Sequence, residues 1–507
     1  MPNARNASHA LTLVAAACIA LAATASADPE SSADAPYEIS AERHIRFDGP
    51  AGRVRAYEIP IAFMGRMTIG DLNRNGQPDF VVSNRDGVAA YDASGDRLWQ
   101  VDAATNWDYP PDYDRGRHNF WHWSSYGYVG DADGDGDAEF LHIGDDWRTV
   151  YIRNGPDGLV ENKIVLSEDL PWMFVFLARR AGESGETATR VIVTTPAYYG
   201  TTRIEEWDVR SGTPERTWSV AMTQKQLGNV AYITPRAANL DAVLGDEIFF
   251  GGLALSETGD VLWHFNASGL GLGGAHTLQV RDFDPDLPGI EATFSIYQPV
   301  EGQPSIVAYA HGAGNAEIGR AFSFNQKVRH PHQHVAGDFD LERPGLEVLS
   351  RGGKGFGHWF TDIRGNEFKP DWRPHPGWDD DGEYVHAIEW DEQPGTEVLY
   401  LKRHVPSPKR PPMRVVSPHT DTFLTPTFGG ATHDDPRSWS AVDNDNPYEA
   451  QGHTVDLFGD GREEILTWGD NAITIYYNSG DPGVPSRWGD ADYMMIKKSW
   501  CQLYNPR

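Results

Sequence analysis

Two histidines, a tyrosine pair and an arginine are the side chains of this sequence best suited to acid–base chemistry. His122 lies in "RGRHNFWHWSSYGYVG", His142 follows twenty residues later, and Tyr198, Tyr199 and Arg203 lie in "AYYGTTR". A histidine can gain or lose a proton near neutral pH, a tyrosine can act as an acid or a base, and an arginine binds a carboxylate through two parallel hydrogen bonds. Together these residue types suit a β-elimination beside a carboxylate.

A β-elimination from a uronic acid needs three groups. A base removes the proton alpha to the carboxylate, a cation or strong donor stabilises the enolate-like charge, and an acid protonates the departing glycosidic oxygen. A glycoside hydrolase would instead need two carboxylates at a defined separation. Each candidate also has a plain structural interpretation: the histidines and tyrosines as packed residues, and Arg203 as the partner of Glu205 or Glu206.

Acidic turns between short apolar strands recur along the chain and must position these residues. The stretch "MTIGDLNRNGQPDFVVSNRDGVAAYDASGDRLWQVD" at 67–102 reads as four strands joined by turns. Its acidic turn aligns with the turns at 131–139 and 456–464, and variants one residue longer occur at 282–291 and 338–347. A degenerate copy lies near 389–401.

Short β-rich units with almost no helical periodicity predict an all-β fold, a single β-propeller of four-stranded blades. We count eight candidates for a first strand, and seven blades remain possible. The last unit lacks a clear fourth strand, which "GRVRAYEIP" at 52–60 could supply, closing the ring. Two β-sandwich domains are the alternative fold.

The acidic turns predict calcium sites. Alternating Asp and Asn side chains around a glycine turn, followed by a later carboxylate, offer the oxygen ligands that calcium prefers. Apolar strands flank these turns, so a helix–loop–helix calcium site is not expected; polar turns without metal are the alternative. The predicted ligands are Asp71, Asn73, Asn75, Asp79, Asp131, Asp133, Asp135, Glu139, Asp456, Asp460 and Glu464.

The alternation of strand direction in a blade separates the metal turns from the proposed chemistry. The acidic turns join first and second strands, whereas His142 lies near the end of a second strand, roughly 20 Å further along. The loop at 115–130 and the loop of the next blade with Tyr198 and Tyr199 should reach this same face. Lys225 could line the cleft, and the predicted substrate-binding residues are Trp121, Trp123, Tyr232 and Arg236.

Composition and the N-terminal segment limit the expected location and partners of the protein. The net charge of -30 and the pI of about 4.9 argue against nucleic acid as a partner. Residues 1–27 read as a secretory signal peptide, so residues 28–507 are expected to form a mature catalytic propeller that is secreted and has no membrane span. An acidic polysaccharide is the expected partner, and a monomer is expected.

The cysteine content leaves few disulfides or metal sites that could stabilise the fold. Removal of the signal peptide would remove Cys18 and leave Cys501 as the single mature thiol, so no intrachain disulfide is expected. A zinc site built from His330, His332, His334 and Cys501 is chemically reasonable. A polar loop and a buried free cysteine are the alternative interpretation.

At these residues the chain resembles secreted propeller polysaccharide lyases, the ulvan lyases most and the rhamnogalacturonan lyases more distantly. The pair His122 and His142, the tyrosine-bearing loop one blade later, and the closing stretch "DLFGDGREEILTWGDNAITIYYNSGDP" carry this resemblance. It implies calcium-stabilised cleavage of a rhamnose-rich, uronic-acid-containing polysaccharide, ulvan first, that leaves an unsaturated uronate.

The resemblance also implies residue roles. His122 would be a base or proton shuttle, His142 and an arginine would neutralise the carboxylate, and Tyr198 or Tyr199 would protonate the leaving oxygen. Two features depart from the ulvan lyases. These lyases have seven blades, whereas this chain has eight candidate first strands. In addition, spacing does not fix the neutralising arginine, since Arg203 fits best while Arg236 could also reach. A rhamnogalacturonan lyase and a non-catalytic, calcium-dependent carbohydrate-binding propeller are the alternative functions.

Overall fold

The computed structural model divides the chain into two compact units, Met1–Glu38 and Ile39–Arg507, and every residue it describes belongs to the second. The predicted signal peptide therefore lies outside the described residues. These are 43–45, 53–63, 65–84, 87–102, 127–144, 147–166, 172, 174–184, 187–195, 201–223, 235–239, 245–250, 253–264, 275–286, 290–296, 304–310, 321–324, 331–352, 357–362, 365–372, 383–402, 413–426, 428–429, 451–469, 471–480, 493 and 497.

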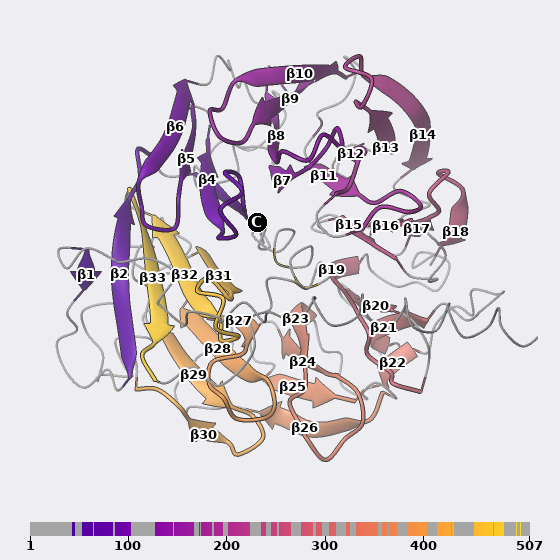
Figure 1. The fold of residues 1–507 in the computed structure, drawn as a ribbon. Helices are drawn as coiled ribbons and strands as arrows, with labels where there is room; N and C mark the ends of the chain where they lie inside the picture. Colours follow the sequence, from indigo (N-terminus) through magenta and orange to yellow (C-terminus); the bar gives the residue numbers. More distant parts are fainter. Residues whose placement is uncertain are drawn as a thin grey trace, which may run out of the picture. The chain divides into compact units, whose positions relative to one another are not determined.

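The described strands of this unit form seven four-stranded sheets and one five-stranded sheet, arranged as a β-propeller (Figure 1). Each four-stranded sheet takes four consecutive strands in chain order, and the pairings between them are antiparallel. The predicted all-β propeller is therefore confirmed, with eight blades when the five-stranded sheet is counted. Two sandwich domains are excluded by the sheet order.

The first four sheets in chain order span residues 66–264. Their strands are β3 (Arg66–Gly70), β4 (Asp79–Ser83), β5 (Gly87–Tyr91) and β6 (Arg97–Asp102); β7 (Tyr128–Gly130), β8 (Glu139–Gly144), β9 (Thr149–Asn154) and β10 (Val160–Val165); β11 (Phe174–Ala178), β12 (Arg190–Thr194), β13 (Thr201–Asp208) and β14 (Glu215–Thr223); β15 (Arg236–Ala238), β16 (Glu247–Phe250), β17 (Leu253–Leu255) and β18 (Val261–His264).

The next three sheets span residues 275–423, and the last joins the two ends of the described chain. Their strands are β19 (Ala275–Arg281), β20 (Glu291–Ile296), β21 (Pro304–Ala310) and β22 (Ala321–Phe324); β23 (Pro331–Gly337), β24 (Glu347–Gly352), β25 (His358–Thr361) and β26 (Glu367–Trp372); β27 (Glu383–Ile388), β28 (Glu397–Lys402), β29 (Met413–Ser417) and β30 (Thr422–Phe423); β31 (Gln451–Val455), β32 (Glu464–Gly469) and β33 (Ala472–Asn478) with β2 (Val54–Pro60) and β1 (His44–Ile45).

The N-terminal strand β2 closes the ring, as the sequence predicted. It pairs along its whole length with β33, from Val54 opposite Asn478 to Pro60 opposite Ala472. The indole of Trp468 in β32 then donates to the carbonyl oxygen of Gly65 at 3.1 Å, which joins the last sheet to the first. Because β2 belongs to the last sheet and β3 to the first, residues 61–65 connect the two sheets covalently.

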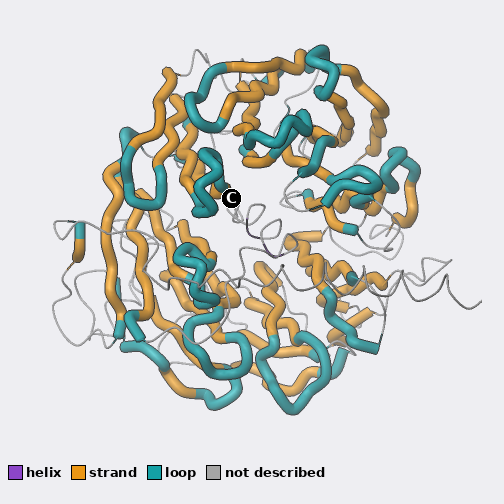
Figure 2. The backbone as a smooth tube through the Cα atoms, in the orientation of Figure 1, coloured by secondary structure: helices purple, strands orange, loops and turns teal. Residues whose placement is uncertain are grey.

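The apolar core lies between the faces of neighbouring sheets. First and second strands such as β3, β4 and β8 are buried along their full length, whereas most residues of the outer strands β14 and β10 are exposed. A strand that is buried on both faces favours continuous apolar and β-branched residues. Strands make up much of the described backbone, and turns and loops join them (Figure 2).

A charged residue begins the buried second strand of every sheet, and this repeat was only partly visible in the sequence. In six sheets a carboxylate at this position accepts a backbone N–H from the turn before it, at 2.7–2.9 Å. The carboxylate thereby fixes the conformation of the acidic turn. These six residues are Asp79, Glu139, Glu291, Glu347, Glu397 and Glu464; Glu247 begins the equivalent strand β16, and Arg190 begins β12.

Within the described residues, no helix has the length and apolar character needed to span a membrane.

Candidate functional site

His142 sits inside the second sheet, packed between two aromatic rings. It lies on β8 with 6% of its surface exposed, and its imidazole stacks on Phe140 and Tyr151 with ring centroids 5.4 and 5.3 Å away. The Nε of Arg153 donates to its Nε2 at 3.0 Å. His142 therefore has the surroundings of a packed polar residue, which was the plain structural interpretation of its position.

Burial keeps the His142 ring neutral. Loss of solvent, followed by the nearby charge of Arg153, lowers the pKa of His142 to about 3. At neutral pH a neutral ring whose Nε2 accepts from Arg153 carries no charge with which to offset a carboxylate. Arg153 supplies the positive charge at this position, and the sequence reasoning missed it because the contact crosses from β8 to β9.

Two further side chains extend this group across the second sheet. Tyr151 lies opposite His142 on β9, and Lys163 lies opposite Tyr151 on β10. The Lys163 ammonium lies 4.7 Å from the centre of the Tyr151 ring, and the Arg153 guanidinium lies 5.4 Å from it. The sheet thus gathers an imidazole, a phenol and two cations from three of its own strands.

Most of the other predicted catalytic and substrate-binding residues fall outside the described part of the chain. This applies to His122, Trp121, Trp123, Tyr198, Tyr199, Tyr232 and Lys225. Their convergence with His142 on one face therefore remains a prediction.

The predicted arginines occupy distinct environments. Arg203 is half-buried near the start of β13, where its backbone N–H donates to the Thr195 hydroxyl at 2.8 Å. The two glutamates named as its alternative partners bind other arginines: Glu205 pairs with Arg216 at 2.8 Å and Glu206 with Arg190 at 2.7 Å.

Arg236 begins the first strand of the fourth sheet. It lies at the start of β15 with 8% of its surface exposed. Its charge contributes to lowering the pKa of His453 on β31, the first strand of the last sheet. The charge of Arg236 therefore acts on the first strand of the last sheet, and a contact with substrate stays a prediction.

The turn at 131–139 is the best candidate metal centre in the described part of the chain. Ligand atoms of Asp131, Asp133 and Glu139 all lie within 4.8 Å of one another. Glu139 Oε2 accepts from the backbone of Ala132 at 2.7 Å, and Asp131 Oδ1 accepts from Gly134 at 2.7 Å. These backbone contacts hold the carboxylates toward a common centre.

The charge balance of this turn fits a divalent cation. The second carboxylate oxygen of Glu139, Oε1, is buried and accepts no hydrogen bond from the described residues. Burial, then the charges of Asp133 and Asp131 among its neighbours, raises the pKa of Glu139 to about 8. A free buried oxygen amid three carboxylates suits calcium, which takes oxygen ligands only. Bound calcium would neutralise these carboxylates and stiffen the turn.

In the other two predicted calcium turns, groups of the turn itself donate hydrogen bonds to the carboxylates. Asp71 accepts from the backbones of Asn75 and Gly76 at 3.1 and 2.8 Å, and Asp79 accepts from Leu72 and Asn73. In the last sheet the Arg462 guanidinium binds Asp460, so a cation already occupies that side of the turn.

Asp456 and Glu464 of the last turn likewise bind backbone N–H groups of the turn itself. Among the three predicted turns, the described residues therefore favour 131–139 as the metal site. For Asn73, Asn75, Asp135 and the remaining predicted ligands, calcium binding stays a prediction.

The distance between the metal turn and His142 is shorter than the sequence estimate. Glu139 is itself the first residue of β8, so His142 lies three residues beyond a candidate ligand, or about 10 Å along the strand. The value of roughly 20 Å was counted from the glycine turn. Glu139 is also a predicted ligand, and it lies in the strand, closer to His142. The corrected distance is still too long for direct coordination, so the metal turn has a supporting role.

The predicted zinc site loses one of its ligands. Both ring nitrogens of His334 on β23 contact hydroxyls, Nδ1 that of Thr277 and Nε2 that of Thr293, the latter at 3.0 Å. His334 therefore joins two neighbouring sheets through threonines and has no ring nitrogen to offer zinc. His330, Cys501 and the side chain of His332 lie outside the described residues.

A pocket on the first strands of four successive sheets was not predicted. It is lined by Gln279, Arg281, Val335, Ala336, His386, Ala387, His453, Thr454 and Lys497. In the sequence, the strands that line this pocket are recognisable only as apolar segments before acidic turns. A single polar residue on a buried strand is usually a satisfied core residue, so it gives no signal of a pocket.

Solved structures that share the fold include three rhamnogalacturonan lyases. The exotype rhamnogalacturonan lyase YesX matches with a TM-score of 0.61 and 17% identity over 91% of this chain and 80% of its own. The rhamnogalacturonan lyase YesW (TM-score 0.57, 17% identity) and a PL11 rhamnogalacturonan lyase from Bacillus licheniformis (0.57, 16%) each match over 90% of this chain and 80% of their own. No protein-family model and no curated protein matches the sequence. At these identities the likeness shows the β-propeller fold.

Proposed function

We propose that this chain is a secreted polysaccharide lyase that cleaves a rhamnose-rich, uronic-acid-containing polysaccharide by β-elimination, with rhamnogalacturonan as the first substrate to test. The observation that carries the proposal is the extent of the structural likeness, which covers nine-tenths of this chain and four-fifths of YesX. The order of substrates differs from the sequence expectation, which placed ulvan first.

Blade number supports this reordering. The ulvan lyases that the sequence resembles have seven blades, whereas this chain forms seven four-stranded sheets and a five-stranded sheet closed by β2. The closing strand pairs with β33 through seven residue pairs, so the additional sheet is a complete blade. Ulvan remains the second substrate to test.

In the proposed reaction a base removes the proton alpha to the uronate carboxylate. The electron pair forms a double bond to the neighbouring carbon, the bond from that carbon to the glycosidic oxygen breaks, and an acid protonates this oxygen. His122 is proposed as the base or proton shuttle, and Tyr198 or Tyr199 as the acid.

The charge on the carboxylate requires a cation, and the surroundings of His142 bear on which residue supplies it. A neutral His142 can donate or accept a hydrogen bond, but Arg153 already occupies its Nε2. We therefore assign charge neutralisation to an arginine, Arg203 or Arg236, and keep His142 as a residue that supports the site.

Calcium at 131–139 is proposed to hold the second sheet in shape and to take no part in the chemistry. A cation there neutralises Asp131, Asp133 and Glu139 on the turn that leads into β8, the strand that carries His142. Its removal should therefore lower activity through stability.

A non-catalytic, calcium-dependent binding propeller is the second candidate function, because the same fold carries binding sites as well as enzymes. Incubation of the full chain with rhamnogalacturonan, ulvan and polygalacturonate separates the possibilities. A lyase produces the ultraviolet absorbance of a conjugated, unsaturated uronate; a hydrolase produces reducing ends without that absorbance; a binding propeller retains the polymer and produces neither. The second and third outcomes would each overturn the proposal.

A further inference from the structure

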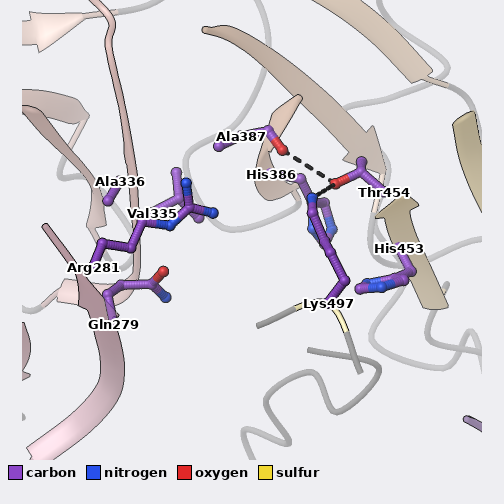
Figure 3. Close-up of a pocket in the computed structure, with 9 residues that line it drawn as sticks. All are labelled: Gln279, Arg281, Val335, Ala336, His386, Ala387, His453, Thr454 and Lys497. Atoms are coloured by element: carbon purple, nitrogen blue, oxygen red, sulfur yellow. Dashed lines mark hydrogen bonds between the residues drawn. The ribbon is translucent and has the colours of Figure 1, made fainter. Parts of the chain in front are cut away.

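The pocket between the first strands β19, β23, β27 and β31 gathers polar side chains that the proposed mechanism does not use. Gln279 and Arg281 extend from β19, and His386, His453 and Lys497 gather on the opposite side (Figure 3). The walls between them are the small residues Val335 and Ala336 on β23. Side chains able to donate hydrogen bonds therefore face one another across the pocket.

A C-terminal lysine reaches this pocket because an ion pair anchors it. The Lys497 ammonium lies 2.5 Å from Glu463 Oε1 and donates to the Thr454 hydroxyl at 3.0 Å. The Tyr493 hydroxyl donates to the same glutamate at 2.8 Å and accepts from the backbone N–H of Asp456. Lys497 is 5% exposed, so its position among these groups is fixed.

The two histidines of the pocket are buried and neutral. His386 is 2% exposed and His453 is 1% exposed. Burial, then the positive charge of Lys497, lowers the pKa of His386 to about 3 and that of His453 well below its usual range. The Nε2 atom of His453 has no hydrogen-bond partner among the described residues.

The charge around the pocket favours an anion over a metal ion. Arg281 and Lys497 are cations, and none of the nine residues described around the pocket is a carboxylate. Arg236 adds positive charge near His453, and the carboxylate of Glu463 is bound by Lys497 and Tyr493. In a chain with a net charge of -30, this is a local reversal of sign.

We propose that this pocket is a carboxylate-binding site, in which Lys497 and Arg281 supply charge from two sides and Gln279 supplies a hydrogen-bond donor. The His453 ring lines the same pocket, so its signals report on a ligand bound beside Lys497. A planar carboxylate accepts from several donors at once and gains most when these are charged. Only the assignment of that carboxylate to a uronic acid sugar rests on the proposed function.

The test is a titration of the full chain, labelled with nitrogen-15 in its histidine rings, with sodium acetate at constant ionic strength. The neutral isostere acetamide is the matched ligand control. Acetate should shift the His453 and His386 ring signals to saturation, and acetamide should not. The signals are assigned from the variants His453→Gln and His386→Gln. Unchanged signals in acetate, or equal shifts in acetamide, would overturn the proposal.

Two lysine variants separate the pocket from a general charge effect. Lys497→Met should weaken acetate binding roughly tenfold to a hundredfold, the loss expected for one hydrogen bond to a charged group. Lys163→Met removes the same charge from β10 of the second sheet and should leave binding unchanged. If Lys497→Met does not fold, Lys497→Arg, which keeps the charge, should bind, and Arg281→Gln should not. Equal weakening in Lys497→Met and Lys163→Met would contradict the site.

Galacturonate and its methyl ester distinguish the source of the carboxylate. Binding of galacturonate but not of the ester supports a uronate site, whereas binding of acetate alone supports a site for a free small carboxylate. Both binding results are measured without turnover, so the carboxylate site can be supported even when no lyase product forms. Conversely, a lyase product without any shift of His453 would overturn the site and leave the proposed function intact.

Discussion

The turn that leads into β8 in the second sheet and the turn that leads into β12 in the third sheet occupy equivalent places and use opposite charges. Asp131, Asp133 and Glu139 gather carboxylates in the former. In the latter, Arg190 begins the buried strand where Glu139 stands in its neighbour. The two turns touch, since the Thr187 hydroxyl donates to Asp131 at 3.2 Å.

The arginine turn is neutralised by the protein itself. Arg190 is fully buried, pairs with Glu206 at 2.7 Å, and donates to the carbonyl oxygens of Asp246 and Glu257 at 2.6 and 3.0 Å. The Arg179 guanidinium pairs with the Asp246 carboxylate at 3.0 Å. Among the described residues, no arginine or lysine pairs with Asp131, Asp133 or Glu139, so the buried charge of these carboxylates needs a proton or a metal ion. Calcium dependence should therefore be specific to one turn.

The largest effect is expected from Arg190→Leu, which removes the 2.7 Å partner of the buried Glu206 carboxylate and leaves only its longer contact with Arg180 at 3.5 Å. Loss of one partner of a buried ion pair costs about 3–5 kcal/mol in the free energy of unfolding. Urea denaturation measures this loss. Arg210→Gln removes the exposed partner of Asp208 on the same sheet and should cost about 0–1 kcal/mol. A loss in Arg190→Leu no larger than in this control would show that the third turn does not depend on the pair.

Removal of calcium should have the next largest effect. At a calcium concentration about a hundred times its dissociation constant, the bound ion stabilises the fold by about 2.7 kcal/mol. A chelator should lower the melting temperature accordingly, and Glu139→Gln should abolish this response. Asp79→Asn in the first sheet should keep the calcium response even if it lowers stability. Loss of the response only in Asp79→Asn would move the metal to the first turn.

A smaller effect, per pH unit, is expected from the carboxylate turn of the seventh sheet. Burial raises the pKa of Glu397 from its usual 4.5 to about 9, so the folded state holds a proton that the unfolded state has lost. The free energy of unfolding should then fall as the pH rises between these values, by up to about 1.4 kcal/mol for each pH unit. Thermal melts in calcium-free buffer measure this slope, and Glu397→Gln should reduce it. An unchanged slope in the variant would be the contrary result.

The smallest effect should follow from breaking the contact between the first and second acidic turns. Arg74 and Asp137 lie 3.0 Å apart and both are about half exposed, so water screens the pair. Asp137→Asn should change the free energy of unfolding by about 0–1 kcal/mol. The same denaturation assay would reveal a larger loss, which would mean that the two turns are coupled.

The propeller and its closure were predictable because both leave local patterns. Acidic turns between apolar strands mark the first strand pairs, and the segment with Val54–Pro60 was the one strand left to complete the last sheet. The site was less predictable. Arg153 reaches His142 across a strand pair, Arg190 replaces a carboxylate without disturbing the apolar pattern, and Lys497 reaches the first strands from the C-terminal segment. Such contacts depend on register and chain path, which spacing alone does not supply.

The central claim, elimination on a uronic-acid polysaccharide, is tested most directly by the mass of the new chain end. Rhamnogalacturonan is digested with the full chain in calcium, and the oligosaccharides are analysed by mass spectrometry beside a His122→Ala digest. Elimination should yield fragments that are lighter by one water molecule than hydrolysis fragments, and the variant should yield none. Fragments carrying the added water, or an intact polymer with wild-type protein, would contradict it.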